Sequence, residues 1–152
     1  MKILLLLSFF TFNNPDPYFY IQPELNEIVM EVVEDLKAGG IWIGFPQRVI
    51  IRMSDAISRG KQIAIAYGTN NDDIVFIVVY KEGYNKLTAN QKKYVILHEI
   101  GHDVYNLKHT KVINAMNKEV PDYMPNSYIR HTVGDFIRMI KRINKRTVGR
   151  TK

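Results

Sequence analysis

The chain has 152 residues, the length of one ordinary domain; 46% of them are hydrophobic and 24% are charged. This balance excludes a disordered chain, a collagen-like repeat and a polytopic membrane protein. There is no cysteine, so disulfides, thiolate ligands and a cysteine nucleophile are excluded, and any metal must be bound by His, Asp or Glu.

The net charge of +6 is concentrated at the C-terminal end of the chain. Seven cations and no acid lie between Arg138 and Lys152, and removing these seven from the total leaves −1 for the rest. We expect them to form the solvated face of a helix; the alternative is contact with phosphate, an anionic surface or an acidic partner. No aromatic residue interleaves with them, so no specific nucleic-acid partner is expected.

Residues 1–14 begin with one lysine and an apolar run that ends at Phe12. This is typical of a secretory signal, and the run is too short to span a bilayer, which needs ~20 apolar residues. We therefore predict export to the periplasm, the cell surface or the medium. No small-x-small cleavage site follows the run. The alternative is therefore a retained segment packed on the body or on an assembly partner, for example in a virion.

The first predicted helix runs from Glu24 to Lys37, after an irregular stretch with three prolines, and Gly39 and Gly40 end it. Acidic residues occupy one side of this helix. Apolar residues recur at helical spacing on the other side, namely Leu25, Ile28, Val29, Val32, Val33 and Leu36.

Three strands are predicted next, over Arg48–Met53, Lys61–Tyr67 and Ile74–Tyr80. The turn-forming residues 68–73 join the last two, which indicates an antiparallel hairpin. The continuous apolar run of Ile74–Tyr80 suits an internal strand. It equally suits an edge strand that aligns an extended substrate by backbone hydrogen bonds.

A capping-box pattern from Thr88 to Gln91 predicts a helix that continues to about Asn106, and a final helix is predicted from about Ser127 to Lys145. Together these elements predict a single α/β (α+β) domain over residues 15–147, with a mixed, antiparallel-edged sheet, and a basic tail over 148–152. The residues expected to be buried in the two helices are Tyr94, Val95, Leu97, Ile100, Val104 and Leu107, and then Ile129, Val133, Phe136, Ile137, Ile140 and Ile143.

The first of these helices contains His98-Glu99-Ile100-Gly101-His102, the H-E-x-x-H pattern. Four residues advance by about 400°, so both imidazoles project from one face, as two ligands of a single zinc ion require. Glu99 lies about 100° from His98, where it can accept a proton from a water whose pKa zinc has lowered to ~7. The pattern predicts a catalytic zinc site with Glu99 as general base; the alternative is a surface helix that carries two histidines by chance.

A catalytic zinc needs a third protein ligand, and His109 is the nearest candidate. In a straight helix His109 would lie about 16 Å along the axis from His98, too far to share a metal whose Zn–N bonds are ~2.0–2.1 Å. The chain must therefore turn back between His102 and His109. Asn106 is the predicted pivot, because asparagine commonly takes the left-handed conformation that ends helices.

The stretch from His98 to His109 resembles the metzincins, the zinc-dependent metallopeptidases within the zincins that carry H-E-x-x-H-x-x-G-x-x-H. It also resembles small metallopeptidase-like proteins of Bacteroidetes-type bacteria and their phages. The resemblance covers chiefly residues 88–117. Two features differ: the third histidine comes one residue later than in the metzincin pattern, and Asn106 replaces the glycine.

This resemblance implies a minimal metzincin-like domain that binds one Zn²⁺ and hydrolyses a peptide or protein substrate. It implies that the ligands are His98, His102 and His109, that the base is Glu99, and that Met116 is the methionine of a buried turn beneath the zinc. Tyr123 or Tyr128 would stabilise the oxyanion, as a tyrosine does in some metzincins.

Several alternatives stay open at this point. Glu119 or Asp135 could replace His109 as the third ligand, and Met124 could replace Met116. His131 is not expected to be a ligand, and Asp103 is expected to orient a neighbouring group. A second class of function is a binding or assembly module that keeps a structural zinc, which a fourth protein ligand would favour.

Overall fold

This computed structural model of the protein describes residues 19–41, 48–58, 60, 62–67, 74–111 and 114–148. The predicted N-terminal segment 1–14, the turn over 68–73 and residues 149–152 of the basic tail lie outside the described residues.

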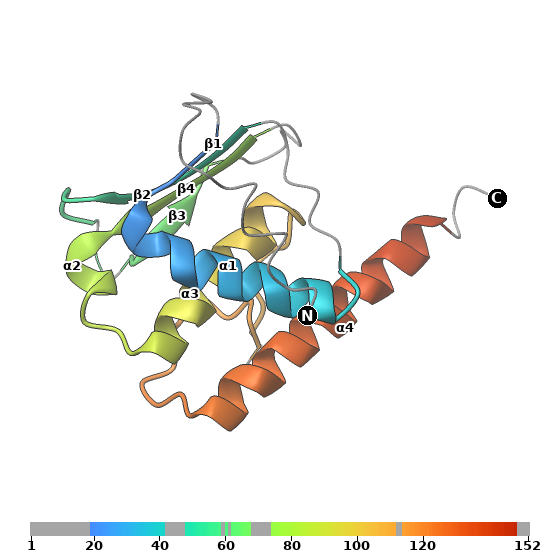
Figure 1. The fold of residues 1–152 in the computed structure, drawn as a ribbon. Coiled ribbons are helices and arrows are strands. Elements are labelled where there is room, and N and C mark those ends of the chain that lie inside the picture. The colour runs from blue at the N-terminus through green and yellow to red at the C-terminus, as the bar shows by residue number, and fades with distance from the viewer. Residues whose placement is uncertain are drawn as a thin grey trace, which may run out of the picture.

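A four-stranded mixed sheet with the strand order β1-β2-β4-β3 forms one layer of the molecule (Figure 1). Parallel pairing joins β1 (Phe19–Ile21) to β2 (Arg48–Ser54) and β2 to β4 (Ile74–Tyr80). The short strand β3 (Ala64–Ala66) runs antiparallel to β4. The predicted α/β class, with a mixed sheet and an antiparallel edge, is confirmed.

The position of β4 decides which of its two interpretations holds. β4 pairs with β2 on one side and with β3 on the other, so its continuous apolar run belongs to an internal strand. The interpretation of Ile74–Tyr80 as the edge strand is therefore wrong; β1 and β3 are the edge strands, and β3 is the edge next to β4.

Strand β1 was not predicted, because the prolines around it indicated irregular chain. It is held by pairing with β2 and by Gln22, which follows it. The Gln22 N–H donates to the carbonyl of Ile51 at 2.8 Å, and the Gln22 side-chain oxygen accepts from the N–H of Met53 at 2.7 Å. This strand depends on a partner thirty residues away, which local sequence does not reveal.

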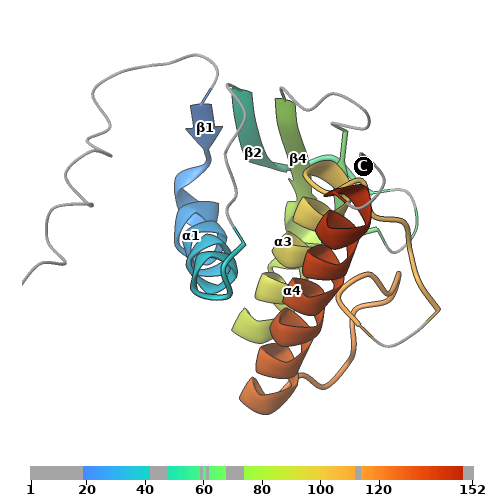
Figure 2. The same cartoon turned by 90° about the vertical axis from the view of Figure 1, so that its right-hand side faces the viewer.

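The helices cover one face of the sheet (Figures 1 and 2). They are α1 (Pro23–Ala38), a short α2 (Lys81–Tyr84) that was not predicted, α3 (Ala89–Asp103) and α4 (Asn126–Val148). α3 packs against the sheet and against both α1 and α4. In the described part of the chain, no helix combines the length and the apolarity that crossing a bilayer needs.

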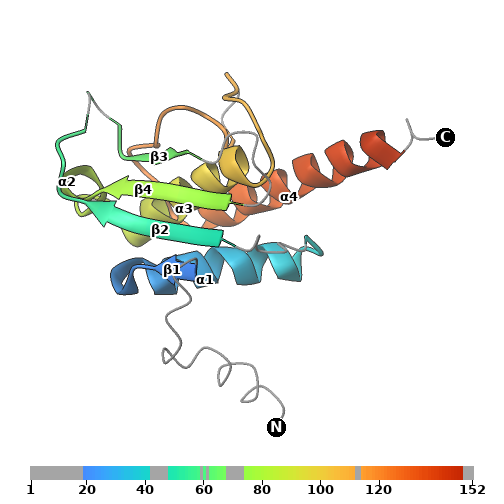
Figure 3. The same cartoon turned by 90° about the horizontal axis from the view of Figure 1, so that it is seen from above.

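Most of the predicted apolar residues of the helices meet the inner face of the sheet in one core, whereas Tyr94 and Ile129 pack in a second, smaller cluster. Residues such as Leu25, Leu36, Ile100 and Phe136 are almost completely buried in the main core. Ile143 is an exception, since it is 40% exposed, and its predicted burial is wrong. The reason is that α4 continues past the body of the domain after Ile140, as Figure 3 shows, and residues 141–144 are all exposed.

Candidate metal centre

The helix that carries the H-E-x-x-H pattern begins with the predicted capping box and ends earlier than predicted. Thr88 and Gln91 exchange both hydrogen bonds of the box, and α3 ends at Asp103 rather than near Asn106. Asn106 takes a positive φ of 48°, and the N–H of Leu107 donates to the carbonyl of Gly101 at 3.0 Å. The chain therefore turns back at Asn106, as predicted.

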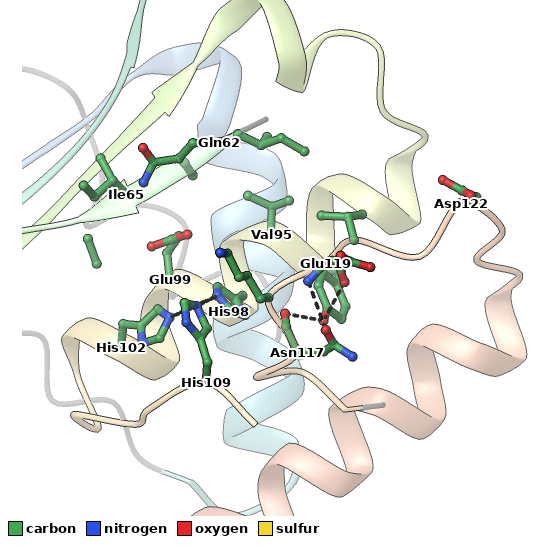
Figure 4. Close-up of a pocket in the computed structure, with 16 residues that line it drawn as sticks. Gln62, Ile65, Val95, His98, Glu99, His102, His109, Asn117, Glu119 and Asp122 are labelled. Atoms are coloured by element: carbon green, nitrogen blue, oxygen red, sulfur yellow. Dashed lines mark hydrogen bonds between the residues drawn. The ribbon is translucent and has the colours of Figure 1, made fainter. Parts of the chain in front are cut away.

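This turn brings the three predicted imidazoles together (Figure 4). The Nε2 atom of His102 lies 3.0 Å from that of His98 and 3.0 Å from that of His109, and the third separation is 3.2 Å. Two nitrogens bound at ~2.0–2.1 Å to one tetrahedral metal ion would be about 3.3 Å apart. His98, His102 and His109 thus lie close enough to bind one metal ion.

Backbone carbonyls set the tautomers of two of these imidazoles. The Nδ1 atom of His98 lies 2.7 Å from the carbonyl oxygen of Ala115, and that of His102 lies 2.6 Å from the carbonyl oxygen of Leu107. Because a carbonyl can only accept, both Nδ1 atoms carry the hydrogen, and the Nε2 atoms present lone pairs to each other. Such an arrangement of acceptors is unfavourable without a cation between them, which fits a metal site.

The surroundings of His98 and His109 also favour the neutral imidazole, the form that binds a metal. Burial lowers the pKa of His98 to about 4, and the neighbouring imidazoles act in the same direction. Burial, together with the charges of His102 and Lys118, also lowers the pKa of His109.

Glu99 is 6% exposed, and its carboxylate lies beside the histidines on the side of β3 (Figure 4). Burial raises its pKa to about 7; the charge of Asp103 acts in the same direction, while a hydrogen bond from the backbone of Ala66 opposes it. A carboxylate with this pKa can both accept and release a proton near neutral pH.

The histidines and Glu99 line one end of an open pocket of about 900 Å³. The edge strand and the residues before it, Gln62–Ala66, form one wall. The segment from Asn117 to Asp122 contributes to the opposite wall, and Tyr94 and Val95 of α3 also line the pocket.

Met116 is completely buried next to the motif, in a turn closed by a hydrogen bond from the N–H of Asn117 to the carbonyl of Asn114 (3.0 Å). A Cβ atom placed on Gly101 would lie 2.5 Å from the Sδ of Met116, so these two residues are in direct contact. Met124 packs elsewhere, in a small cluster with Tyr94 and Ile129. Of the two candidate methionines, Met116 is the one beneath the motif.

The two carboxylates proposed as alternative ligands do not join the cluster. Among the described residues, the only group of three suitable side chains is the histidine triad. Glu119 lines the pocket outside this group, and Asp135 pairs on α4 with Arg138 and with His131, which also lies outside the group.

The predicted tyrosines and Asp103 have other surroundings. Tyr123 is 80% exposed and Tyr128 packs against the cluster of Met124; neither is among the residues that line the pocket. The Oδ2 atom of Asp103 accepts a hydrogen bond from the N–H of Phe76 on β4 at 2.8 Å, so Asp103 orients a neighbour as expected.

Sequence reasoning missed Asn114, whose side-chain oxygen accepts hydrogen bonds from the N–H of Met116 (2.8 Å) and from the hydroxyl of Thr110 (2.9 Å). The N–H of Thr110 in turn donates to the carbonyl of Met116 at 2.9 Å. These contacts place His109, next to Thr110, beside the Met116 turn. An asparagine two residues before a buried methionine is a recognisable turn signal that could have indicated this role.

Comparisons of the chain with protein-family models, with curated proteins and with solved structures found no match. The candidate site is therefore described by its own geometry: three converging imidazoles, one buried glutamate and one open pocket.

Proposed function

We propose that this protein is a zinc-dependent peptidase of metzincin-like type that hydrolyses peptide bonds. The observation that carries the proposal is the convergence of three Nε2 atoms, 3.0–3.2 Å apart, beside a buried glutamate in an open pocket. Zinc is favoured because three histidine ligands with a fourth position left for water are typical of its catalytic sites.

The Nε2 atoms of His98, His102 and His109 would hold the zinc. When bound, zinc lowers the pKa of a water molecule to ~7 and polarises the carbonyl of the substrate. Glu99 accepts a proton from the attacking water and later delivers it to the leaving amine. Burial, which raises the pKa of Glu99 in the metal-free site, and a bound cation, which would lower it, act in opposite directions.

The edge strand β3 offers a place for an extended substrate. Hydrogen bonds to β4 flank this strand on both sides. The N–H of Tyr67, just after β3, donates to the carbonyl of Phe76 on β4, and the N–H of Tyr80 on β4 donates to the carbonyl of Ile63, just before β3. Because donors alternate along an antiparallel strand, the backbone groups of Ala64 point toward the open edge above the pocket. A peptide that pairs with this edge would place its scissile bond near Glu99.

The test is peptide hydrolysis by the wild type and by Glu99→Gln, with the zinc content measured on both. We expect one zinc per chain in each, and loss of about 10²–10⁴-fold in the hydrolysis rate for Glu99→Gln. Glu82→Gln is the matched control, since it alters an exposed carboxylate that pairs with Lys86 outside the pocket and should keep the activity. A wild type that binds zinc but cleaves no peptide in a diverse library would contradict the proposal and favour a zinc-stabilised binding or assembly module.

A further inference from the structure

We infer that Tyr94 is a positioning residue of the metal centre, whose hydroxyl holds the turn that orients the imidazole of His98. The inference rests on the proposed metal binding and concerns a side chain whose sequence pattern indicated only a core residue.

Tyr94 lies one helical turn before His98 on α3 and is 1% exposed. Its ring is stacked near the imidazole of His98, with centroids 6.2 Å apart and an interplanar angle of 21°. Its hydroxyl lies 3.0 Å from the carbonyl oxygen of Asn114 and 3.0 Å from that of Asn117. These carbonyls belong to the two ends of one tight turn.

The residues between the two ends contact the metal centre directly. The carbonyl of Ala115 accepts the hydrogen bond from Nδ1 of His98, and Met116 packs against Gly101. The path from Tyr94 through this turn to His98 begins and ends on the same helix, so it forms a closed ring of contacts. Within this ring the Tyr94 hydroxyl determines the position of the Ala115 carbonyl. That carbonyl in turn sets the rotation and the tautomer of the His98 imidazole.

The hydroxyl is well suited to this role because it stays a donor. Burial raises the pKa of Tyr94 well above its ordinary value, so the hydroxyl keeps its proton at all working pH values. Two other tyrosines with a buried hydroxyl differ from it: the hydroxyls of Tyr84 and Tyr105 have no hydrogen-bond partner in the described part of the chain. Tyr84→Phe and Tyr105→Phe therefore remove the same chemical group as Tyr94→Phe but leave the hydrogen bonds of the Met116 turn in place.

The same hydroxyl lies where the metal centre and the pocket wall join. The carbonyl of Glu119 is 3.5 Å from it, and the segment that follows the turn, from Asn117 to Val120, lines the pocket. In Tyr94→Phe the carbonyls of Asn114 and Asn117 would lose the one hydroxyl hydrogen that they share, which would leave the Asn114 carbonyl only the N–H of Asn117, and the turn would be free to shift. The expected consequence is a weaker metal site in a protein that still folds.

The experiment compares the zinc dissociation constants of the wild type, Tyr94→Phe, Tyr84→Phe and Tyr105→Phe by competition with a chelator. We expect about 10–100-fold weaker binding for Tyr94→Phe, the usual effect of removing a group that supports a ligand, and no change for the other two. Thermal unfolding without zinc serves as the readout of general stability, because a merely structural role would lower the melting temperature without this selective loss of affinity.

A second comparison places Tyr94→Phe in the His98→Ala background, where the hydroxyl no longer has His98 to position. The effect on residual zinc binding should then disappear. Wild-type zinc affinity in Tyr94→Phe, or an equal loss in Tyr84→Phe, would overturn the inference alone. Absence of zinc binding by the wild type would overturn the proposed function as well, so the two failures are distinguishable.

Discussion

The backbone carbonyl of Leu107 lies 2.6 Å from the Nδ1 atom of His102, five residues earlier in the chain. This contact exists because the chain turns back at Asn106, which takes a positive φ of 48°. One turn thus has two effects on the metal centre: it directs the Nε2 lone pair of His102 inward, and it delivers His109 to the same point.

Asn106→Val should weaken zinc binding by about 10-fold or more. A positive φ costs an ordinary L residue about 1–2 kcal/mol, and a β-branched residue adopts it least readily, so the turn would shift. Asn106→Gly is the matched control, because glycine accepts this conformation and should keep the wild-type affinity. Chelator competition measures both, and a valine variant that binds zinc as tightly as the wild type would refute the role of the pivot.

Zinc should stabilise the folded protein through His109. At a free zinc concentration of 100 times the dissociation constant, the free energy of unfolding rises by about 2.7 kcal/mol. This corresponds to a rise of roughly 5–10 °C in melting temperature for a domain of this size. We expect His109→Ala to lose most of this shift and His131→Ala, an exposed histidine on α4, to keep it. A full shift in His109→Ala would instead point to a carboxylate such as Glu119 as third ligand.

Gly101→Ala should destabilise the protein by about 1–2 kcal/mol despite the better helix propensity of alanine. The new Cβ would lie 2.5 Å from the Sδ of Met116 and 3.0 Å from the ring of Phe136, so the core beneath the motif must move. In Gly134→Ala on α4 the nearest atom is 3.5 Å away, and this control should gain stability by up to about 1 kcal/mol. Urea unfolding of both variants checks the opposite signs.

Lys93 joins α3 to α1, since its ammonium lies 2.8 Å from Glu31 and 2.7 Å from Asp35 while the lysine side chain is only 10% exposed. Lys93→Met should lower the free energy of unfolding by about 1–2 kcal/mol. This loss is smaller than that from breaking a fully buried ion pair, because both carboxylates are partly exposed and can be rehydrated. Lys86→Met, which breaks an exposed pair with Glu82, should cost no more than about 0.5 kcal/mol.

The contribution of Lys93 should also depend on pH in a defined direction. Burial lowers the pKa of Lys93, but the hydrogen bonds and charges of Asp35 and Glu31 outweigh it, so the pKa lies above its ordinary value of 10.5. A raised lysine pKa stabilises the folded state fully below that ordinary value, and the benefit is lost as the pH rises through the folded-state pKa. The difference in free energy of unfolding between wild type and Lys93→Met should therefore stay constant from neutral pH to about 10 and shrink above it. A difference that shrinks already below pH 9 would contradict this.

Much of the architecture could be predicted from local pattern. The helices α1, α3 and α4 lie where helical spacing and the Thr88 capping box placed them, with ends that differ by a few residues. The strands β2 and β4 were likewise predicted, because runs of β-branched residues between turn formers are a local signal. Strand β1 and the order of the strands were not, because pairing depends on partners that are distant in the chain.

The sequence by itself determined that His98 and His102 project from one face of a helix and that Glu99 lies about 100° from His98, since each helical residue advances by about 100°. It also indicated that His109 could reach them only through a turn. Only the tertiary structure decided that the turn delivers the imidazole of His109 to within 3.2 Å of both others, and that Ala115 and Leu107 orient the first two. Those contacts join segments that meet only when the sheet, α3 and the Met116 turn pack together, and no local spacing encodes that meeting.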